Sequence, residues 1–197
     1  MSEEAYHSRQ GAHAVSQARA QAMRIGYADP PYPGCAHRYK GHPDYAGEVD
    51  HLELAGRLMV EFDGFILHTR SGSLRELLPM FGDDVRVMAW VKPFCAFKRN
   101  VPVAYAWEPA LVKSCRKPVV GRTVKPLRDF CSANITMKKG LCGVKPEAVC
   151  HWAFEVMGAN PDDELVDIFP GTGAVGRAWE SWKQLISSKP EPKGETK

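Results

Sequence analysis

The feature of this sequence that most constrains its fold is the alternation of short apolar runs with longer amphipathic segments. The apolar runs have the length of strands and cover residues 24–28, 64–69, 85–91, 104–113 and 165–169. Helical periodicity is found over residues 48–61, 74–81, 146–157 and 176–186. Strands that alternate with helices are typical of a layered α/β fold with a mostly parallel sheet. Residues 114–144 have no clear periodicity, and we expect mostly loop there.

Length and composition indicate one globular domain. The chain has 197 residues, of which 44% are hydrophobic and 25% charged, and these values exclude a disordered chain. No apolar run approaches the roughly 18 residues of a membrane span. The first ten residues carry acids and no apolar core, so we expect no signal peptide and a cytoplasmic protein. We divide the chain into an N-terminal extension (1–23), a domain (24–186) and a flexible tail (187–197).

Charge is distributed unevenly along the chain. Between residues 92 and 128 there are nine basic residues and one acid, Glu108, which gives this stretch a net charge of +8. The whole chain carries +3, so the remaining residues together carry −5. A basic segment on a mildly acidic body favours a polyanionic partner, and a solvated lysine-rich loop accounts for the charge equally well.

The six cysteines predict neither disulfides nor a metal site. No C-x-x-C pair occurs, and the nearest approach to a ligand cluster is Cys142, Cys150 and His151. Without a sign of export, reduced cysteines that act as small core residues are the better interpretation.

A glycine-rich loop follows the last predicted strand. Residues 171–176 read G-T-G-A-V-G and stand directly before a predicted helix. Glycines allow a ligand to approach the backbone closely, and a helix N-terminus offers free N–H donors. A dinucleotide site would need a further strand that ends in an acid, and a Walker loop would need a Gly-Lys-Ser/Thr sequence. The sequence contains neither.

A second loop, Asp29-Pro30-Pro31-Tyr32, follows the first predicted strand. One interpretation is a proline-stiffened turn with a buried tyrosine. The other is a rigid polar clamp, in which a carboxylate, a backbone carbonyl and an aromatic face hold a flat ligand with an exocyclic amino group. Because both loops follow strands of a parallel sheet, we expect them to open on the same edge.

These motifs together resemble a known family. Asp29-Pro30-Pro31-Tyr32 resembles the catalytic motif of the S-adenosylmethionine-dependent methyltransferases that modify adenine N6 or cytosine N4 in DNA. Residues 167–173 (D-I-F-P-G-T-G) resemble their cofactor motif, residues 143–147 (G-V-K-P-E) the segment before it, and residues 106–112 a later strand. The order, with the catalytic motif first, is that of the permuted subclass. The resemblance implies a Rossmann-like class I methyltransferase sheet over residues 24–186.

The resemblance also implies roles for individual residues. Asp29 and the Pro30 carbonyl would accept hydrogen bonds from the target amino group, Pro31 completes the motif, and Tyr32 would stack on a flipped base. Lys145 and Pro146 would lie near the methionine end of S-adenosylmethionine, where Lys145 meets the carboxylate. The other implied cofactor-binding residues are Asp167, Phe169, Gly171, Thr172 and Gly173. The Asp form of the motif leans toward adenine N6.

The basic stretch is the segment available for contact with DNA, whether double-stranded with a flipped base or single-stranded. We expect residues 92–144 to face the nucleic acid, since aromatic residues are interleaved there with basic ones. The candidate DNA-binding residues are Lys92, Lys98, Arg99, Arg116, Lys117, Arg122, Lys125 and Arg128. The candidate aromatic contacts are Phe94, Phe97, Tyr105 and Trp107.

The sequence departs from the family pattern after the cofactor helix. Complete members continue with two more strands, the first of which ends in an acid that binds the cofactor ribose, and residues 187–197 cannot form them. We therefore expect the sheet to be short on that side. Three alternatives stay open: a catalytically impaired nucleic-acid-binding homologue, a cytosine-N4 methyltransferase and an RNA methyltransferase.

Overall fold

The computed structural model describes residues 21–41, 45–95, 99–116, 126–136 and 144–188. The strands within them are β1 (Arg24–Ala28), β2 (Gly64–His68), β3 (Arg86–Val91), β4 (Trp107–Lys113), β5 (Phe130–Ser132) and β6 (Glu164–Asp167). The α-helices are α2 (His51–Glu61), α3 (Leu74–Leu77), α4 (Glu147–Met157) and α5 (Ala174–Ser187). Short 3-10 helices are η1 (Ala36–Tyr39), η2 (Ser71–Ser73) and η3 (Leu78–Met80).

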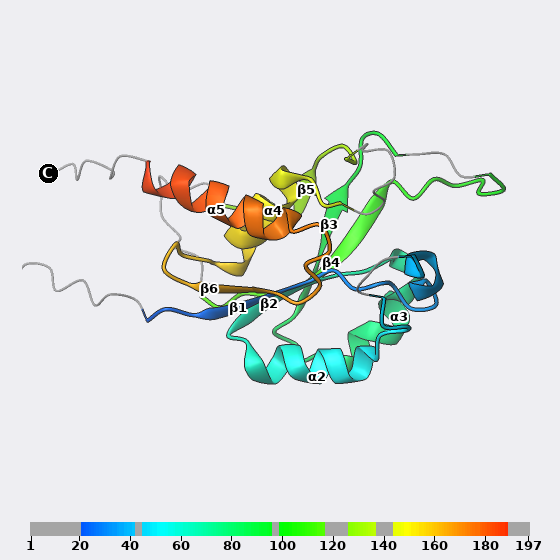
Figure 1. Cartoon of the computed structure of the whole chain (residues 1–197), viewed down its shortest axis with the longest axis horizontal. Coiled ribbons are helices and arrows are strands. Elements are labelled where there is room, and N and C mark those ends of the chain that lie inside the picture. The colour runs from blue at the N-terminus through cyan, green and yellow to red at the C-terminus, as the bar shows by residue number, and fades with distance from the viewer. Residues whose placement is uncertain (1–20, 42–44, 96–98, 117–125, 137–143, 189–197) are drawn as a thin grey trace, which may run out of the picture.

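The strands form one sheet in the order β5-β3-β4-β2-β1-β6 (Figure 1). β1 pairs in parallel with both β2 and β6, and β3 pairs in parallel with β5. β4 runs antiparallel to its neighbours β2 and β3, so it is the reversed strand of the described sheet. The predicted, mostly parallel α/β sheet is confirmed. The carboxyl ends of the parallel strands and the amino end of β4 share one side of the sheet, which we call the carboxyl edge.

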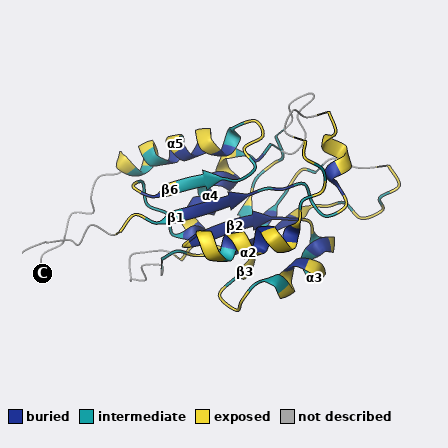
Figure 2. Ribbon diagram, turned by 60° about the horizontal axis from the view of Figure 1, so that its bottom comes forward, coloured by how far each residue is buried: buried dark blue, intermediate teal, exposed yellow. Residues whose placement is uncertain are grey.

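Helices cover both faces of the sheet and create three layers (Figure 1). On one face α4 and α5 bury a core that contains Tyr27, Phe154 and Trp179. On the other face α2 and α3 bury a second core that contains Leu58 and Leu67. Successive side chains of a strand point to opposite faces, so β1, β2 and β4 each contribute to both cores. Figure 2 shows these buried strands between helices whose outer sides are exposed.

Helix boundaries follow local chemistry. α2 begins after Asp50, whose carboxylate accepts hydrogen bonds from the backbone N–H groups of Leu52 and Glu53 at 3.0 Å. α4 ends at Gly158, which has a φ of 75° that favours glycine. The helix expected over 74–81 instead splits into α3 and η3, because Pro79 has no N–H to continue the α-helical pattern. No helix in the described part of the chain is long and apolar enough to cross a membrane.

Two features of the sheet bear on the sequence predictions. β5 lies in the stretch expected to be loop, because three residues are too few for a periodic pattern. It is held to β3 by hydrogen bonds from Ala89 N–H to the Asp129 carbonyl and from Ala133 N–H to the Val91 carbonyl. Among the described residues β6 is an edge strand of the sheet. Residues 1–20 and 189–197 lie outside the described ranges.

Candidate active site

The two loops singled out in the sequence lie next to each other at the carboxyl edge. Asp29 follows β1 and the glycine loop follows β6, and these strands are parallel neighbours with Tyr27 opposite Asp167. The backbone N–H of Ile168 donates to the Tyr27 carbonyl at 2.9 Å, which extends the pairing beyond β6. The expectation that both loops open on one edge of the sheet is confirmed.

A buried ammonium group joins two carboxylates at this edge. The Nζ of Lys145 lies 2.8 Å from Oδ2 of Asp29 and 2.8 Å from Oε1 of Glu108. The Lys145 side chain is 3% exposed, that of Glu108 7% and that of Asp29 20%. Asp29 is thus the member of the group that solvent or a ligand reaches most easily.

Glu108 has further cationic and aromatic neighbours. Its Oε2 lies 2.9 Å from Nζ of Lys92, which is 15% exposed. The Lys92 and Lys145 ammonium groups lie 4.3 and 5.6 Å from the ring centroid of Trp90. Carboxylate and aromatic contacts of this kind compensate a cation in a site largely shielded from water.

The protonation states of this cluster follow from its contacts. Burial alone would raise the pKa of Glu108, but the Lys145 ammonium and His68 outweigh burial and hold that pKa well below its usual range. Burial would lower the pKa of Lys145, but Asp29 and Glu108 raise it well above the ordinary lysine value. Glu108 and Lys145 therefore stay ionised at neutral pH, with Lys145 as the central cation.

A chain of neutral groups lies beneath the ion cluster. Nε2 of His68 is 2.9 Å from the Tyr27 hydroxyl, and Nδ1 of His68 is 3.4 Å from Oε1 of Glu108. Burial, followed by the Lys145 charge, lowers the pKa of His68, so the ring is neutral at neutral pH. Burial likewise raises the pKa of the Cys150 thiol, 3.9 Å from the Tyr27 hydroxyl, to about 12. These groups position Glu108 without adding charge.

Tyr32 completes the clamp predicted at the end of β1. Tyr32 is half-buried, and its carbonyl accepts a 2.8 Å hydrogen bond from the N–H of Cys35, which closes a tight turn over Pro33 and Gly34 directly after the motif. Burial raises the pKa of the Tyr32 hydroxyl, with a partial offset from Lys145. The phenol is therefore neutral, as a stacking ring requires.

The glycine loop is shaped for close approach of a ligand. Gly171 and Gly173 have φ angles of 45° and 70°, which other residues rarely adopt. A Cβ on Gly171 would have its nearest neighbour at 3.9 Å, so the space beside this residue is open. Gly173 caps α5, and the Thr172 carbonyl accepts a 2.9 Å hydrogen bond from Arg177.

Asp167, at the end of β6, carries an unusual carboxylate. Both of its oxygens are buried, and neither makes a well-formed hydrogen bond among the described residues. Burial raises the pKa of Asp167 to about 6, a shift that the backbone N–H of Phe169 reduces and Asp29 reinforces. A buried carboxylate that pairs with no cation among the described residues, beside a ligand-accessible loop, is suited to a cationic ligand group.

The predicted DNA-binding residues do not form one surface. Lys92 is buried against Glu108 in the ion cluster. Arg116 lies at the opposite edge of the sheet, where both of its terminal nitrogens pair with Asp163, at 2.6 and 2.7 Å. Arg99 and Arg128 are exposed. The remaining candidates lie outside the described residues: Lys98, Lys117, Arg122 and Lys125, together with Phe97.

Sequence reasoning missed the central place of Glu108. Its signal was present, because Glu108 is the single acid within the basic stretch and begins a buried strand after Trp107. Lys145 was expected beside the cofactor carboxylate, whereas its ammonium pairs with Asp29 and Glu108. Pro146, also a cofactor candidate, caps the amino end of α4 next to it.

Comparison with known proteins supports the fold. No family model and no curated protein match the sequence. The structure is similar to a crystal structure of an M1.HpyAVI–SAM complex, with a TM-score of 0.56 and 18% identity over 82% of this chain and 79% of that chain. The fold is that of the Rossmann-like methyltransferases. A crystal structure of M1.HpyAVI also matches, with 16% identity and a TM-score of 0.49.

Proposed function

We propose that this protein is an S-adenosylmethionine-dependent DNA methyltransferase that acts on the N6 amino group of adenine. The observation that carries the proposal is the position of the Asp29 carboxylate. It is held by Lys145 at the carboxyl edge, one strand away from the glycine loop and the buried Asp167 carboxylate. The similarity to the M1.HpyAVI–SAM complex supports the choice of cofactor.

The acceptor side of the site would bind and orient the target amino group. Asp29 and the Pro30 carbonyl accept its two N–H hydrogens, which directs the nitrogen lone pair toward the methyl donor. Positive charge develops on the nitrogen as the new N–CH₃ bond forms and the S–CH₃ bond breaks. The ionised Asp29 stabilises that charge and accepts the proton that the nitrogen releases. Tyr32 supplies the ring on which the flipped adenine stacks.

The cofactor side would be formed by the loop after β6. Bound S-adenosylmethionine supplies an electrophilic methyl group on a sulfonium centre. Asp167 would pair with its ammonium group, and Gly171 and Gly173 would let it approach the backbone, with Phe169 and Thr172 completing the pocket. We place Lys145 on the acceptor side, because its ammonium is already paired with Asp29 and Glu108. There it holds the Asp29 carboxylate in place.

The test is transfer of a radioactive methyl group from S-adenosylmethionine to DNA, compared between the wild type and Asp29→Ala. The substitution removes the hydrogen-bond acceptor, so we expect about 10²–10³-fold slower transfer. Calorimetry should find cofactor binding unchanged, because Asp29 acts on the acceptor. An Asp29→Ala protein that methylates at the wild-type rate would refute the role of Asp29.

The same assay separates the alternatives. Digestion of the product to nucleosides identifies N6-methyladenine or N4-methylcytosine, and parallel reactions with RNA test the other polymer. A wild-type protein that binds DNA but neither binds S-adenosylmethionine nor transfers a methyl group would instead be a non-catalytic homologue. The observation that favours a non-catalytic homologue is that β6, which carries the cofactor loop, is an edge strand among the described residues.

A further inference from the structure

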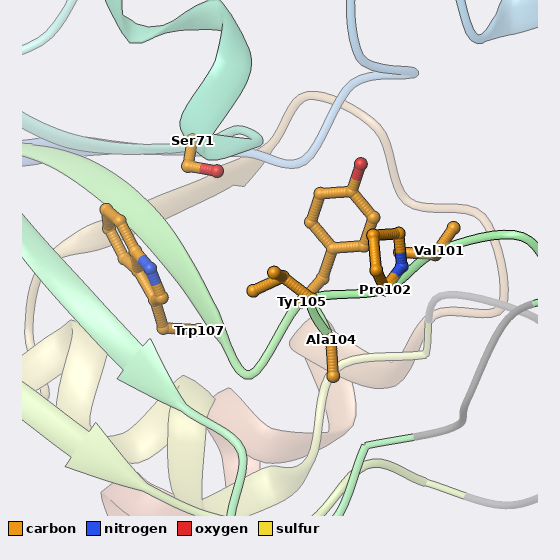
Figure 3. A pocket seen from close by; sticks show the side chains of 7 residues that line it. Ser71, Val101, Pro102, Ala104, Tyr105 and Trp107 are labelled. Atoms are coloured by element: carbon orange, nitrogen blue, oxygen red, sulfur yellow. The ribbon is translucent and has the colours of Figure 1, made fainter.

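A pocket at the carboxyl edge lies beside the ion cluster but is separate from it. It has a volume of about 340 Å³ and is lined by Ser71, residues 101–105 and Trp107 (Figure 3). Figure 3 shows the rings of Trp107 and Tyr105 on two sides of the space, with Ser71 near its rim. The volume is at the lower end of the range for small-molecule sites, about 300–1,000 Å³, and is suited to one planar group.

The pocket and the ion cluster share the start of β4. Glu108 joins the cluster, whereas Trp107, the preceding residue, lines the pocket. Consecutive Cα atoms are about 3.8 Å apart, and their side chains point to opposite faces of a sheet. Ser71 follows His68 of the site by three residues. A ligand in the pocket would therefore lie across β4 from Asp29, Lys145 and Glu108.

The walls of the pocket are aromatic and exposed. Trp107 is 43% exposed and Tyr105 is 54% exposed. Large aromatic side chains are more deeply buried than this in most folded proteins. The segment that carries Tyr105 is anchored, since the Lys92 N–H donates to the Ala106 carbonyl at 2.8 Å. The two rings are thus presented on a fixed segment at the mouth of the site.

Charge around the pocket suits a phosphate backbone. Residues 92–107 contain no acid, and exposed Arg99 precedes the pocket-lining segment by two residues. Exposed Arg70 precedes Ser71 on the other wall. Aromatic faces flanked by arginines are the combination that binds single-stranded nucleic acid, where bases stack and cations contact phosphates.

We propose that the pocket between Trp107 and Tyr105 stacks a nucleobase that neighbours the target base in the same DNA strand. This inference rests on the proposed function, because it assumes a DNA strand at the carboxyl edge. Bases of one strand are linked through single phosphodiesters, so a second base site must lie close to the first. The shared start of β4 satisfies that condition. The pocket would then hold the strand in place while the target adenine is at Asp29.

The first experiment measures binding of the full chain to a short single-stranded oligonucleotide and to an oligonucleotide of the same length in which abasic sites replace the bases. Trp107→Ala should weaken binding of the base-containing strand about 5- to 150-fold, the equivalent of one lost base–aromatic stack. Binding of the abasic strand should be unchanged, since phosphate contacts remain. Trp107→Phe should restore most of the affinity, and Tyr105→Ala should repeat the loss.

A matched control and a contact map complete the test. Val60→Ala changes a residue of α2 that is 86% exposed and does not line the pocket, and it should bind both strands like the wild type. Photocrosslinking with 5-iodouracil placed next to the target adenine should label Trp107 or Tyr105. Wild-type affinity in both alanine variants, or crosslinks only elsewhere, would overturn the stacking site. Methyl transfer by the wild type is measured in a separate assay. Failure of the stacking proposal can therefore be told apart from failure of the proposed function.

Discussion

The Nζ of Lys145 lies 2.8 Å from Oδ2 of Asp29, and the same nitrogen lies 2.8 Å from Glu108. One buried cation therefore balances two carboxylates, only one of which is open to a ligand. Removing a buried cation leaves uncompensated negative charge, which is far more costly than loss of a surface ion pair. Lys145 thus couples the stability of this edge of the sheet to the position of the Asp29 carboxylate.

Lys145→Met should reduce both stability and methyl transfer. Asp29 and Glu108 would face each other without the shared cation, at a cost of about 3–5 kcal/mol in the free energy of unfolding. The pKa of Glu108 should rise from its lowered value, because His68 and Lys92 would then oppose the effect of burial without Lys145. Urea denaturation and the radioactive transfer assay measure the two effects.

The double variant Lys145→Met/Glu108→Gln provides the control for that prediction. Replacing the buried carboxylate by a neutral amide removes one uncompensated charge, so the double variant should recover part of the lost stability. Transfer should stay low, because Asp29 is still unsupported. If Lys145→Met unfolds at the same urea concentration as the wild type, the buried ion pair does not have the importance assigned to it here.

In the cofactor-free protein, Asp167 should contribute more to stability at about pH 4 than at about pH 6. Its pKa is about 6 in the folded protein, above the ordinary aspartate value of 3.8, so the folded state binds the proton more tightly. The contribution of Asp167 to stability therefore falls as pH rises from about 4 to about 6. Asp167→Asn should be more stable than the wild type at pH 7, by about 1 kcal/mol after allowance for solvent screening. Thermal melts across this range provide the measurement, and a melting temperature unaffected by Asp167→Asn at pH 7 would contradict it.

The same carboxylate gives cofactor binding a pH dependence. An ionised Asp167 pairs with the ammonium group of S-adenosylmethionine, whereas the protonated form does not. Calorimetry on the wild type should therefore give affinities that weaken as pH falls below about 6. Asp167→Asn should bind more weakly at pH 7 and lose this dependence. If cofactor affinity depends on pH in the same way in both proteins, Asp167 does not pair with the cofactor.

The predictions from sequence succeeded where the signal is local and failed where it depends on partners far along the chain. The turn after β1 and the glycine loop after β6 were found because prolines and glycines constrain backbone locally. The union of Asp29, Glu108 and Lys145 could not be found in this way, since it depends on the strand order that brings β1 and β4 to one edge. Arg116 shows the same limit: its charge was visible in the sequence, but the pairing with Asp163 was not.

Arg116 and Arg128 should therefore respond differently to removal. Arg116→Ala would leave Asp163, whose side chain is fully buried, without its cation, at a cost of about 3–5 kcal/mol. Arg128 is exposed, with its guanidinium 5.6 Å from the ring centroid of Phe130, so Arg128→Ala should change stability little. For DNA binding the expectation is reversed. Arg128→Ala should lower the slope of log affinity against log salt by about 1, while folded Arg116→Ala keeps the wild-type slope.

Denaturation curves and salt titrations of DNA binding on the two variants test this contrast directly. Arg116→Lys serves as the conservative control, because it keeps the charge but cannot form both short contacts with Asp163, and it should recover only part of the stability.

The pKa of Asp163 is lowered, because Arg116 and the N–H groups of Met23 and Asn160 outweigh its burial. The stability that Asp163 contributes is thus present at neutral pH and lost as pH falls through its lowered pKa. The melting temperature of Arg116→Ala should therefore depend less on acid pH than that of Arg128→Ala. If Arg116→Ala instead lowers the slope of log DNA affinity against log salt, Arg116 contacts DNA.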